Sequence, residues 1–272
     1  MHSVSEREAK DMKIEVTKLD GNEMEFVLQD SSPAFANSLR RAAIYEVPVM
    51  AIDEVEFTSN DSAMYDEMIA HRLAMIPIKT PLKGYKTPEK CGCKEGRCPQ
   101  CSVEFTIKAE GPTTVKSGDL KSSDEEVVPV SPEIPIVKLE KGQKIELTAI
   151  ARLGYGKDHA KWQPGIVVYK YMPVIEIDKS CNACGDCVKA CPRRILEIAD
   201  GKLRVTNIME CTMCRSCSDA CTSGSIRVSG DNTKFIFRVE SSGALPPDQI
   251  IIRAAKALED KFEEFADAVE KI

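Results

Sequence analysis

Two stretches of the sequence, CNACGDCVKACP at residues 181–192 and CTMCRSCSDACT at residues 211–222, repeat one cysteine spacing. Each has three cysteines separated by two residues and a fourth after three more, and together they use eight of the chain's twelve cysteines. Three thiolates in a tight loop plus one just beyond is the ligand arrangement of a cubane [4Fe–4S] cluster. Zinc sites use paired knuckles with a longer gap between the pairs, and disulfides belong to oxidising compartments. The spacing therefore predicts iron–sulfur ligation.

The two runs, together with an Asp200-Gly201 hairpin between them, resemble a bacterial-type two-cluster ferredoxin module over residues 174–229. In that family the fourth cysteine of each run ligates the cluster of the other run. The resemblance implies two [4Fe–4S] clusters with four ligands each. The first would take Cys181, Cys184, Cys187 and Cys221, and the second would take Cys211, Cys214, Cys217 and Cys191. The second run departs from the pattern at Thr222, where the first run has Pro192.

The remaining four cysteines, Cys91, Cys93, Cys98 and Cys101, lie within eleven residues of one another. Gly92, Gly96 and Pro99 allow tight turns between them. Four thiolates so close together suit the tetrahedral coordination of a structural zinc ion. Free thiols and oxidation-prone pairs are the alternatives.

Strands and helices alternate irregularly in the rest of the chain, which predicts an α+β fold. A hairpin is expected over residues 14–28, and a helix begins at the Ser-Ser-Pro signal of residues 31–33. A second short helix is expected over residues 64–74. Further strands are expected at 49–57, 103–109, 145–153, 166–177 and 235–239. The polar, proline-containing segment 122–135 is expected to be an exposed connector.

The last segment has an apolar seam that repeats at alternating intervals of four and three residues, as in a coiled-coil heptad. Its members are Ile251, Ala255, Leu258, Phe262, Phe265, Val269 and Ile272. A narrow seam on a terminal helix favours docking on a partner helix. The alternative is packing on the chain's own sheet.

The composition limits the classes of function. The 272 residues have a net charge of −6 and contain no block of lysine and arginine, which argues against binding of nucleic acid through a basic surface of this chain. The N-terminal residues lack the apolar stretch of a signal peptide, and no apolar run is long enough for a membrane span. A cytoplasmic protein without a membrane partner is expected.

Three segments resemble hallmarks of the RNA polymerase α-subunit family, and the third is typical of its archaeal and eukaryotic branch. They are SLRRAAIYEVP at 38–48, DEMIAHRLAMIP at 66–77 and GYGKDHAKWQP at 154–164. The resemblance implies a discontinuous dimerisation domain made of residues 1–55, 160–175 and 228–272. Residues 56–159 would form an inserted mixed β domain, and residues 174–229 an inserted iron–sulfur domain. The loop at 91–101 resembles the zinc loop of the eukaryotic counterpart, with one more residue in its central gap.

The same resemblance implies a role in assembly. Family members of the archaeal branch pair with a smaller subunit, L, and the pair is a platform for the large catalytic subunits and the small assembly subunits of DNA-directed RNA polymerase. This chain has no P-loop, nucleophile elbow or acidic magnesium triplet, so no catalytic residue is expected in it. Nucleotidyl transfer would then belong to the complex alone.

An electron-transfer subunit of an oxidoreductase is the rival class of function, because ferredoxin-like clusters also conduct electrons. Residues 174–229 contain seven acidic and eight basic side chains, unlike the acidic surface of a freely diffusing ferredoxin. The rest of the sequence offers no flavin or nicotinamide motif. An iron–sulfur scaffold outside transcription is a third option, which the three α-family segments disfavour.

Overall fold

A computed structural model describes residues 12–93 and 97–271. Their contacts divide the chain into two compact units, and each unit is made of several segments. The first unit comprises residues 12–18, 25–37 and 168–238, and the second comprises residues 19–24, 38–167 and 239–271. Within the described residues, no helix is both long enough and apolar enough to cross a bilayer.

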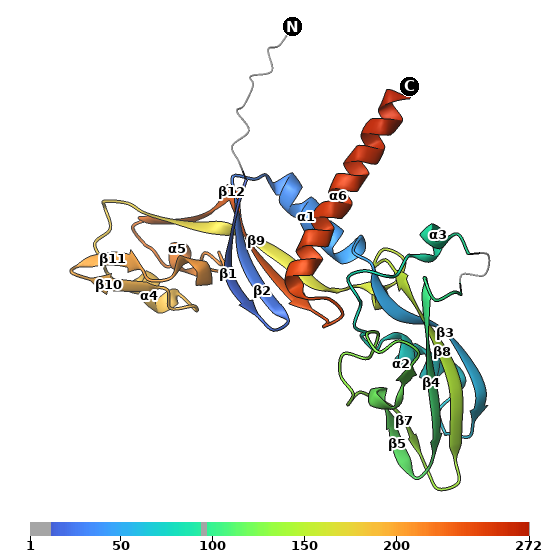
Figure 1. Cartoon of the computed structure of the whole chain (residues 1–272). Coiled ribbons are helices and arrows are strands. Elements are labelled where there is room, and N and C mark those ends of the chain that lie inside the picture. Colours follow the sequence, from blue (N-terminus) through green and yellow to red (C-terminus); the bar gives the residue numbers. More distant parts are fainter. Residues whose placement is uncertain (1–11, 94–96, 272) are drawn as a thin grey trace. The chain divides into compact units, whose positions relative to one another are not determined.

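A four-stranded sheet has the strand order β1-β2-β12-β9 (Figure 1). Its strands are β1 (Lys13–Asp20), β2 (Glu23–Gln29), β12 (Ile226–Ser241) and β9 (Gly165–Ile177). The predicted hairpin is confirmed, and its turn contains Gly21 at a φ of 53°, which glycine adopts without steric cost. Aromatic rings hold the middle of the sheet. Phe26 stacks on Phe237 at a centroid distance of 4.8 Å, and Tyr169 lies 5.6 Å from Phe235.

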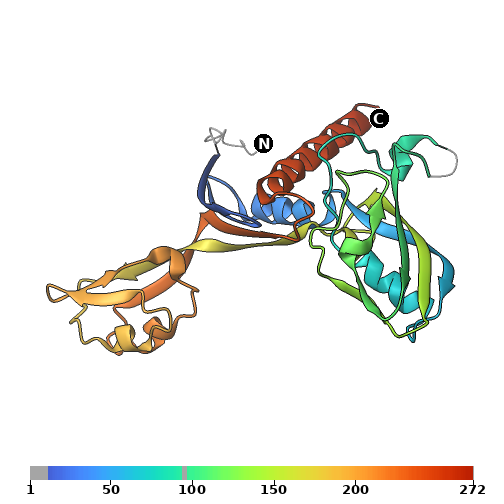
Figure 2. The same cartoon turned by 60° about the horizontal axis from the view of Figure 1, so that its bottom comes forward.

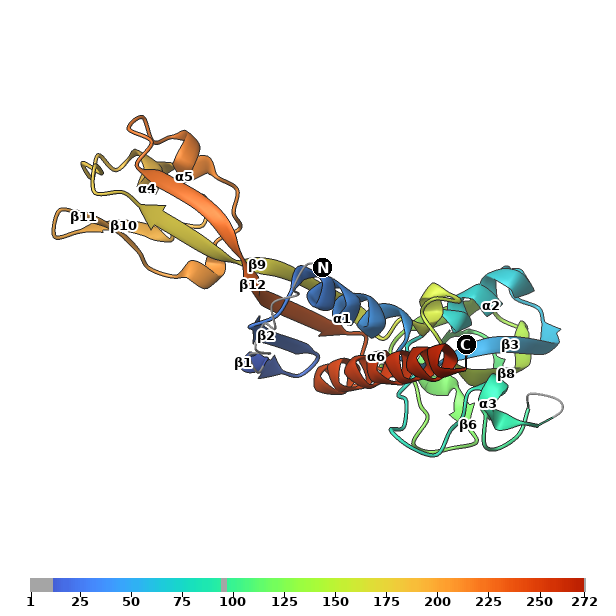
Figure 3. The same cartoon turned by 90° about the horizontal axis from the view of Figure 1, so that it is seen from above.

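The cysteine-rich part of the first unit is built on the continuations of β9 and β12 (Figure 3). Between these strands lie the short elements α4 (Asp186–Ala190), β10 (Leu196–Ala199), β11 (Lys202–Val205), η3 (Ile208–Glu210) and α5 (Ser216–Asp219). The hairpin β10–β11 turns at Asp200 and Gly201, whose φ angles of 53° and 70° are those that a two-residue type I′ turn requires. The predicted module boundaries at residues 174 and 229 fall inside β9 and β12, so the module continues these strands without a linker.

The second unit contains a sheet of strand order β3-β8-β4-β6 (Figure 2). The strands of this sheet are β3 (Val49–Asn60), β8 (Lys144–Gly154), β4 (Ser102–Glu110) and β6 (Lys121–Ser122). A ribbon of β5 (Thr113–Lys116) and β7 (Pro135–Leu139) pairs separately. The unit's remaining short elements are α2 (Asp66–Ala74), α3 (Pro88–Cys91), η1 (Ser117–Asp119) and η2 (Ala160–Trp162).

One hydrophobic core joins the sheet, the ribbon and α2 of the second unit. Phe105 and Leu147 from the sheet, Val137 from the ribbon and Leu73 from α2 are all buried in it. Val127 is also fully buried there. The prediction of an exposed connector at 122–135 is therefore only partly right, because Glu125, Glu126 and Glu133 are exposed but Val127 packs in the core.

Two longer helices complete the fold, α1 (Pro33–Tyr45) and α6 (Pro247–Glu270). The Ser32 hydroxyl accepts a hydrogen bond from the Phe35 N–H at 3.2 Å, and Pro33 is the first helical residue, as the sequence predicts. The first turns of α6 are anchored in the chain, with Ile250 and Ala254 fully buried. Its later turns are exposed.

Candidate metal centres

The two cysteine runs fold into loops of matching backbone conformation. Left-handed residues occur at equivalent positions of both, with φ angles between 53° and 87°. The pairs are Ala183 and Met213, Gly185 and Arg215, and Arg194 and Gly224. Few non-glycine residues adopt this conformation. Its occurrence at equivalent positions indicates that the two loops have the same backbone structure and place their cysteines in the same way.

Hydrogen bonds repeat with the same symmetry. The Cys181 N–H donates to the Asp178 carbonyl at 3.1 Å, and the Cys211 N–H donates to the Ile208 carbonyl at 3.1 Å. Each loop then enters a short helix, α4 or α5, which contains the third cysteine of its run. The fourth cysteine follows directly after the helix or one residue beyond it.

Two small cavities open between the loops, and each is lined by four cysteines. The first is lined by Cys181, Cys184, Cys187 and Cys221, with Asn182, Ala183, Gly185, Leu203, Ser223 and Ile226 around them. The second is lined by Cys191, Cys211, Cys214 and Cys217, with Ile175, Arg193, Ile195, Leu196, Thr212, Arg215 and Val228. The cysteines of each cavity are those that the ferredoxin resemblance assigns to one cluster.

The surroundings of these thiols fit an iron–sulfur cluster. Cys187, Cys211 and Cys217 are buried within a hydrophobic core, and burial raises the pKa of the Cys187 and Cys217 thiols. A buried thiolate needs positive charge beside it, which iron supplies. The Ser216 hydroxyl donates to the Cys214 sulfur at 3.4 Å and lowers the pKa of that thiol. Four thiols converging on each cavity form the donor set of a [4Fe–4S] cluster.

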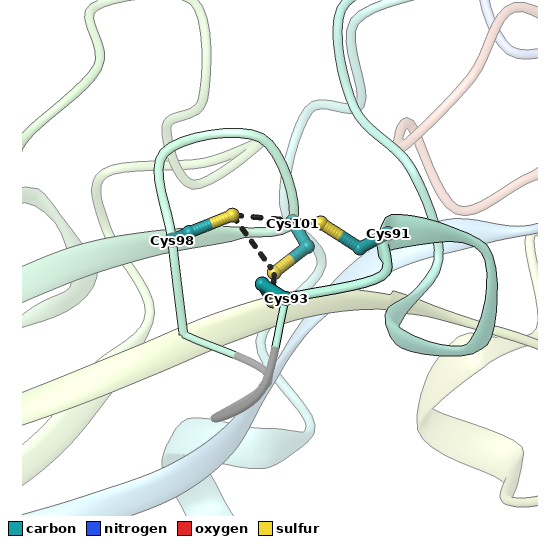
Figure 4. Close-up of side chains that lie close together, drawn as sticks. All are labelled: Cys91, Cys93, Cys98 and Cys101. Atoms are coloured by element: carbon teal, nitrogen blue, oxygen red, sulfur yellow. Dashed lines mark hydrogen bonds between the residues drawn. The ribbon is translucent and has the colours of Figure 1, made fainter.

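The cysteines of the 91–101 segment also converge (Figure 4). Their four Sγ atoms all lie within 4.8 Å of one another. The Cys91–Cys98 sulfur distance is 3.5 Å, and the Cys93–Cys101 and Cys98–Cys101 distances are 3.6 Å. A tetrahedral zinc site with Zn–S bonds of about 2.3 Å has sulfur–sulfur edges of about 3.8 Å. The group therefore fits a four-coordinate zinc ion with little movement.

The surroundings of these cysteines affect the protonation of their thiols. Gly92 follows α3 in the left-handed conformation, with a φ of 68°. An N–H of Gln100 donates to the Cys98 sulfur and lowers the pKa of that thiol to about 7, whereas burial raises the pKa of Cys101 to about 12. A bound cation would favour the thiolate form of both.

The seam residues of α6 fall into two groups. Ile251 is buried within the chain, and Leu258 is half-buried. Ala255 is exposed, and Phe262, Phe265 and Val269 are 67%, 68% and 51% exposed. Ile272 lies outside the described residues.

A groove of about 470 Å³ lies between α1 and α6, and the sequence-based interface prediction did not include the α1 residues that line it. Ser38, Arg41 and Tyr45 of α1 face Leu258 of α6 across it. Glu46 also lines the groove and forms ion pairs with Lys261 and Lys157, at 2.5 Å and 3.4 Å. The SLRRAAIYEVP segment was the signal that could have identified these residues.

Two family models match the chain. The RNA polymerase Rpb3/RpoA insert domain matches residues 54–178, and the 4Fe-4S dicluster domain matches residues 173–222. Both matches overlap the expected inserted domains at 56–159 and 174–229. They define a polymerase subunit of the α type that carries an iron–sulfur domain.

Curated relatives match over nearly the whole chain. The DNA-directed RNA polymerase subunit Rpo3 of Archaeoglobus fulgidus is 44% identical over 96% of this chain and 98% of its own length. The Rpo3 subunits of Methanosarcina acetivorans and Thermococcus kodakarensis are 40% and 41% identical, over 96% and 92% of this chain and 99% and 94% of theirs. The chain belongs to the family of archaeal RNA polymerase subunit Rpo3.

Proposed function

We propose that this chain is the D-type, non-catalytic assembly subunit of an archaeal DNA-directed RNA polymerase. It pairs with the smaller subunit L, and the pair receives the large catalytic subunits and the small assembly subunits. The single observation that carries this proposal is the exposed apolar end of α6, where Phe262, Phe265 and Val269 have no cover within the described chain. Nucleotidyl transfer belongs to the complex, and this subunit makes little or no contact with nucleic acid.

The pairing surface combines the end of α6 with the groove beside α1. The exposed seam residues supply apolar area, and Arg41 and Tyr45 supply polar groups at its border. An interface with an apolar centre and a polar rim is typical of stable subunit contacts. Residues 1–55, 160–175 and 228–272 then act as the dimerisation domain, with residues 56–159 and 174–229 as insertions.

The iron–sulfur domain holds two [4Fe–4S] clusters in this proposal. The first is ligated by Cys181, Cys184, Cys187 and Cys221, and the second by Cys211, Cys214, Cys217 and Cys191. The lining of the two cavities supports this division. Because one ligand of each cluster comes from the other run, the clusters cross-link segments that share only a small apolar core. Their role is chiefly structural, and oxidation of the clusters weakens polymerase assembly.

The cysteine group at residues 91–101 holds one structural zinc ion. The support is the near-tetrahedral spacing of the four sulfur atoms. A zinc ion there would fasten α3 to the start of β4, because Cys91 ends the helix and Cys101 directly precedes the strand.

An anoxic pull-down of the tagged chain from its native cells, followed by mass spectrometry, tests the proposed function. A small α-like partner and two very large subunits are expected. Recovery of flavoprotein or dehydrogenase subunits would instead identify an electron-transfer protein. The role of the clusters is tested with Cys184→Ser and Cys214→Ser variants, which are expected to recover less of the large subunits. Assembly equal to wild type would contradict a structural role for the clusters.

A further inference from the structure

Positively charged side chains hold the backbone at the start of the second cysteine loop. The Lys170 ammonium donates to the carbonyl oxygens of Met209 at 2.5 Å and of Cys211 at 3.0 Å. The Arg193 Nε donates to the carbonyl of Glu210 at 3.3 Å, and its guanidinium also pairs with the Glu210 carboxylate. Three successive carbonyls are thus bound by two cations.

These carbonyls follow or end the short helix η3, where backbone carbonyls lack partners within the helix. A charged donor satisfies them more strongly than a neutral one. Lys170 lies on β9, so its contacts fasten the loop that contains Cys211 to a strand of the sheet. The loop and the strand are far apart in sequence, and the two hydrogen bonds of Lys170 connect them directly.

The orientation of the Cys211 carbonyl affects the cavity. In a planar trans peptide the C=O and the following N–H point in opposite directions. When Lys170 holds the Cys211 carbonyl, the N–H of Thr212 is turned to the other side of the peptide, and Thr212 lines the second cavity. Lys170 therefore fixes the orientation of a peptide that belongs to the cavity lining, and polar groups beside a cluster are among the factors that set its reduction potential.

The first cavity has a different electrostatic environment. Its lining contains no charged side chain, whereas Arg193 and Arg215 line the second. Lys179, which occupies the position in the first run equivalent to Met209, is exposed. The two loops thus differ in the charge of their surroundings, although they share their backbone geometry.

We propose that Lys170 is a positioning residue for the second iron–sulfur site: it fixes the loop that presents Cys211 and selectively favours the reduced state of the cluster bound there. This inference rests on the two-cluster assignment of the proposed function. A nearby cation favours reduction because the reduced cluster carries one more negative charge. The first cluster should be insensitive to this lysine.

The test uses the full chain, purified without oxygen and loaded with iron and sulfide. Lys170→Met removes the charge and keeps the alkyl chain, Lys170→Arg restores a cation, and Lys179→Met is the matched control. Iron content, the rate of iron release to a chelator, and the midpoint potentials from electron paramagnetic resonance titration are measured for each.

For Lys170→Met, half of the iron should leave roughly ten- to hundred-fold faster than from wild type, as expected for the loss of hydrogen bonds from a charged donor. One midpoint potential should fall and the other should stay unchanged. The effect should persist in a Cys184→Ser background and vanish in a Cys214→Ser background. Lys170→Arg should return both properties toward wild type, and Lys179→Met should match wild type.

Two results would overturn the inference. The first is wild-type release rates and potentials in Lys170→Met, and the second is an equal effect of Lys179→Met. The iron content of the wild-type chain tests the two-cluster assignment separately. A wild-type chain that holds only one cluster would overturn both the two-cluster proposal and the role of Lys170.

Discussion

Replacing Phe262 and Phe265 with alanine should strongly weaken pairing with the proposed partner, subunit L, and leave the chain itself intact. The two rings are 67% and 68% exposed, so they contribute little to the stability of the isolated chain. Substitutions at such positions usually change the free energy of unfolding by less than about 0.5 kcal/mol. Any large effect must therefore come from the partner.

The expected loss of affinity follows from the exposed area. A phenylalanine buries roughly 200 Å² when it is fully covered, so covering two-thirds of that surface removes about 130 Å² from water. At about 25 cal/mol per Å², each ring contributes about 3 kcal/mol to the free energy of binding, or about two orders of magnitude in Kd. The double variant is expected to lose somewhat less than the sum, because neighbouring hot spots are not additive.

Isothermal titration of each variant with purified subunit L measures this effect, and thermal unfolding of the unpaired chain checks its integrity. Ile252→Ala is the matched control, because Ile252 is 58% exposed on the same helix but lies outside the seam. If the phenylalanine variants bind as wild type does, or if Ile252→Ala loses as much affinity, then the seam is not the pairing surface.

Three further predictions address stability and metal content. Phe105→Ala should destabilise the second unit by about 3–5 kcal/mol in denaturant unfolding, because a fully buried ring is replaced by a cavity. Cys93→Ser should lower the zinc content measured by mass spectrometry from one ion per chain toward zero, and unchanged zinc would exclude this group as the site. Burial raises the pKa of Glu46, but hydrogen bonds and charge interactions with Lys261 and Lys157 outweigh burial and leave it lowered. The stabilisation by Glu46, below about 1 kcal/mol, is thus complete at neutral pH and is lost as the pH falls below about 4.5. The difference in unfolding free energy between wild type and Glu46→Gln should shrink over that range, and a constant difference would contradict the role of the ion pairs.

Local signals in the sequence predicted much of the fold. The Asp200-Gly201 turn, the Ser32 cap of α1 and the strand positions depend on neighbouring residues, so they can be inferred without the tertiary structure. The cysteine runs could also be recognised from the sequence, because the spacing of ligands along the chain is a local property. Their division between two clusters came from family resemblance and remains a prediction.

Long-range contacts were beyond the reach of the sequence. Val127 lies in a polar segment, and only the packing of distant strands makes it a core residue. Ile251 follows the heptad seam, but the anchoring of the first turns of α6 buries it within the chain. Lys170 has no motif at all, since its role depends on carbonyl groups about forty residues away.

The iron–sulfur loops and the aromatic sheet of the first unit share the same two strands. Ile175 on β9 and Val228 on β12 line the second cavity, and Tyr169 and Phe235 on these strands pack together in the sheet. Because both strands continue without a break between the two places, a change in the cavity lining shifts residues only a few positions from the aromatic contacts. Packed cores resist small continuous shifts and respond by rearranging. A cluster bound at this position would thus influence the sheet without touching it, which is a physical route for the proposed link between cluster integrity and assembly.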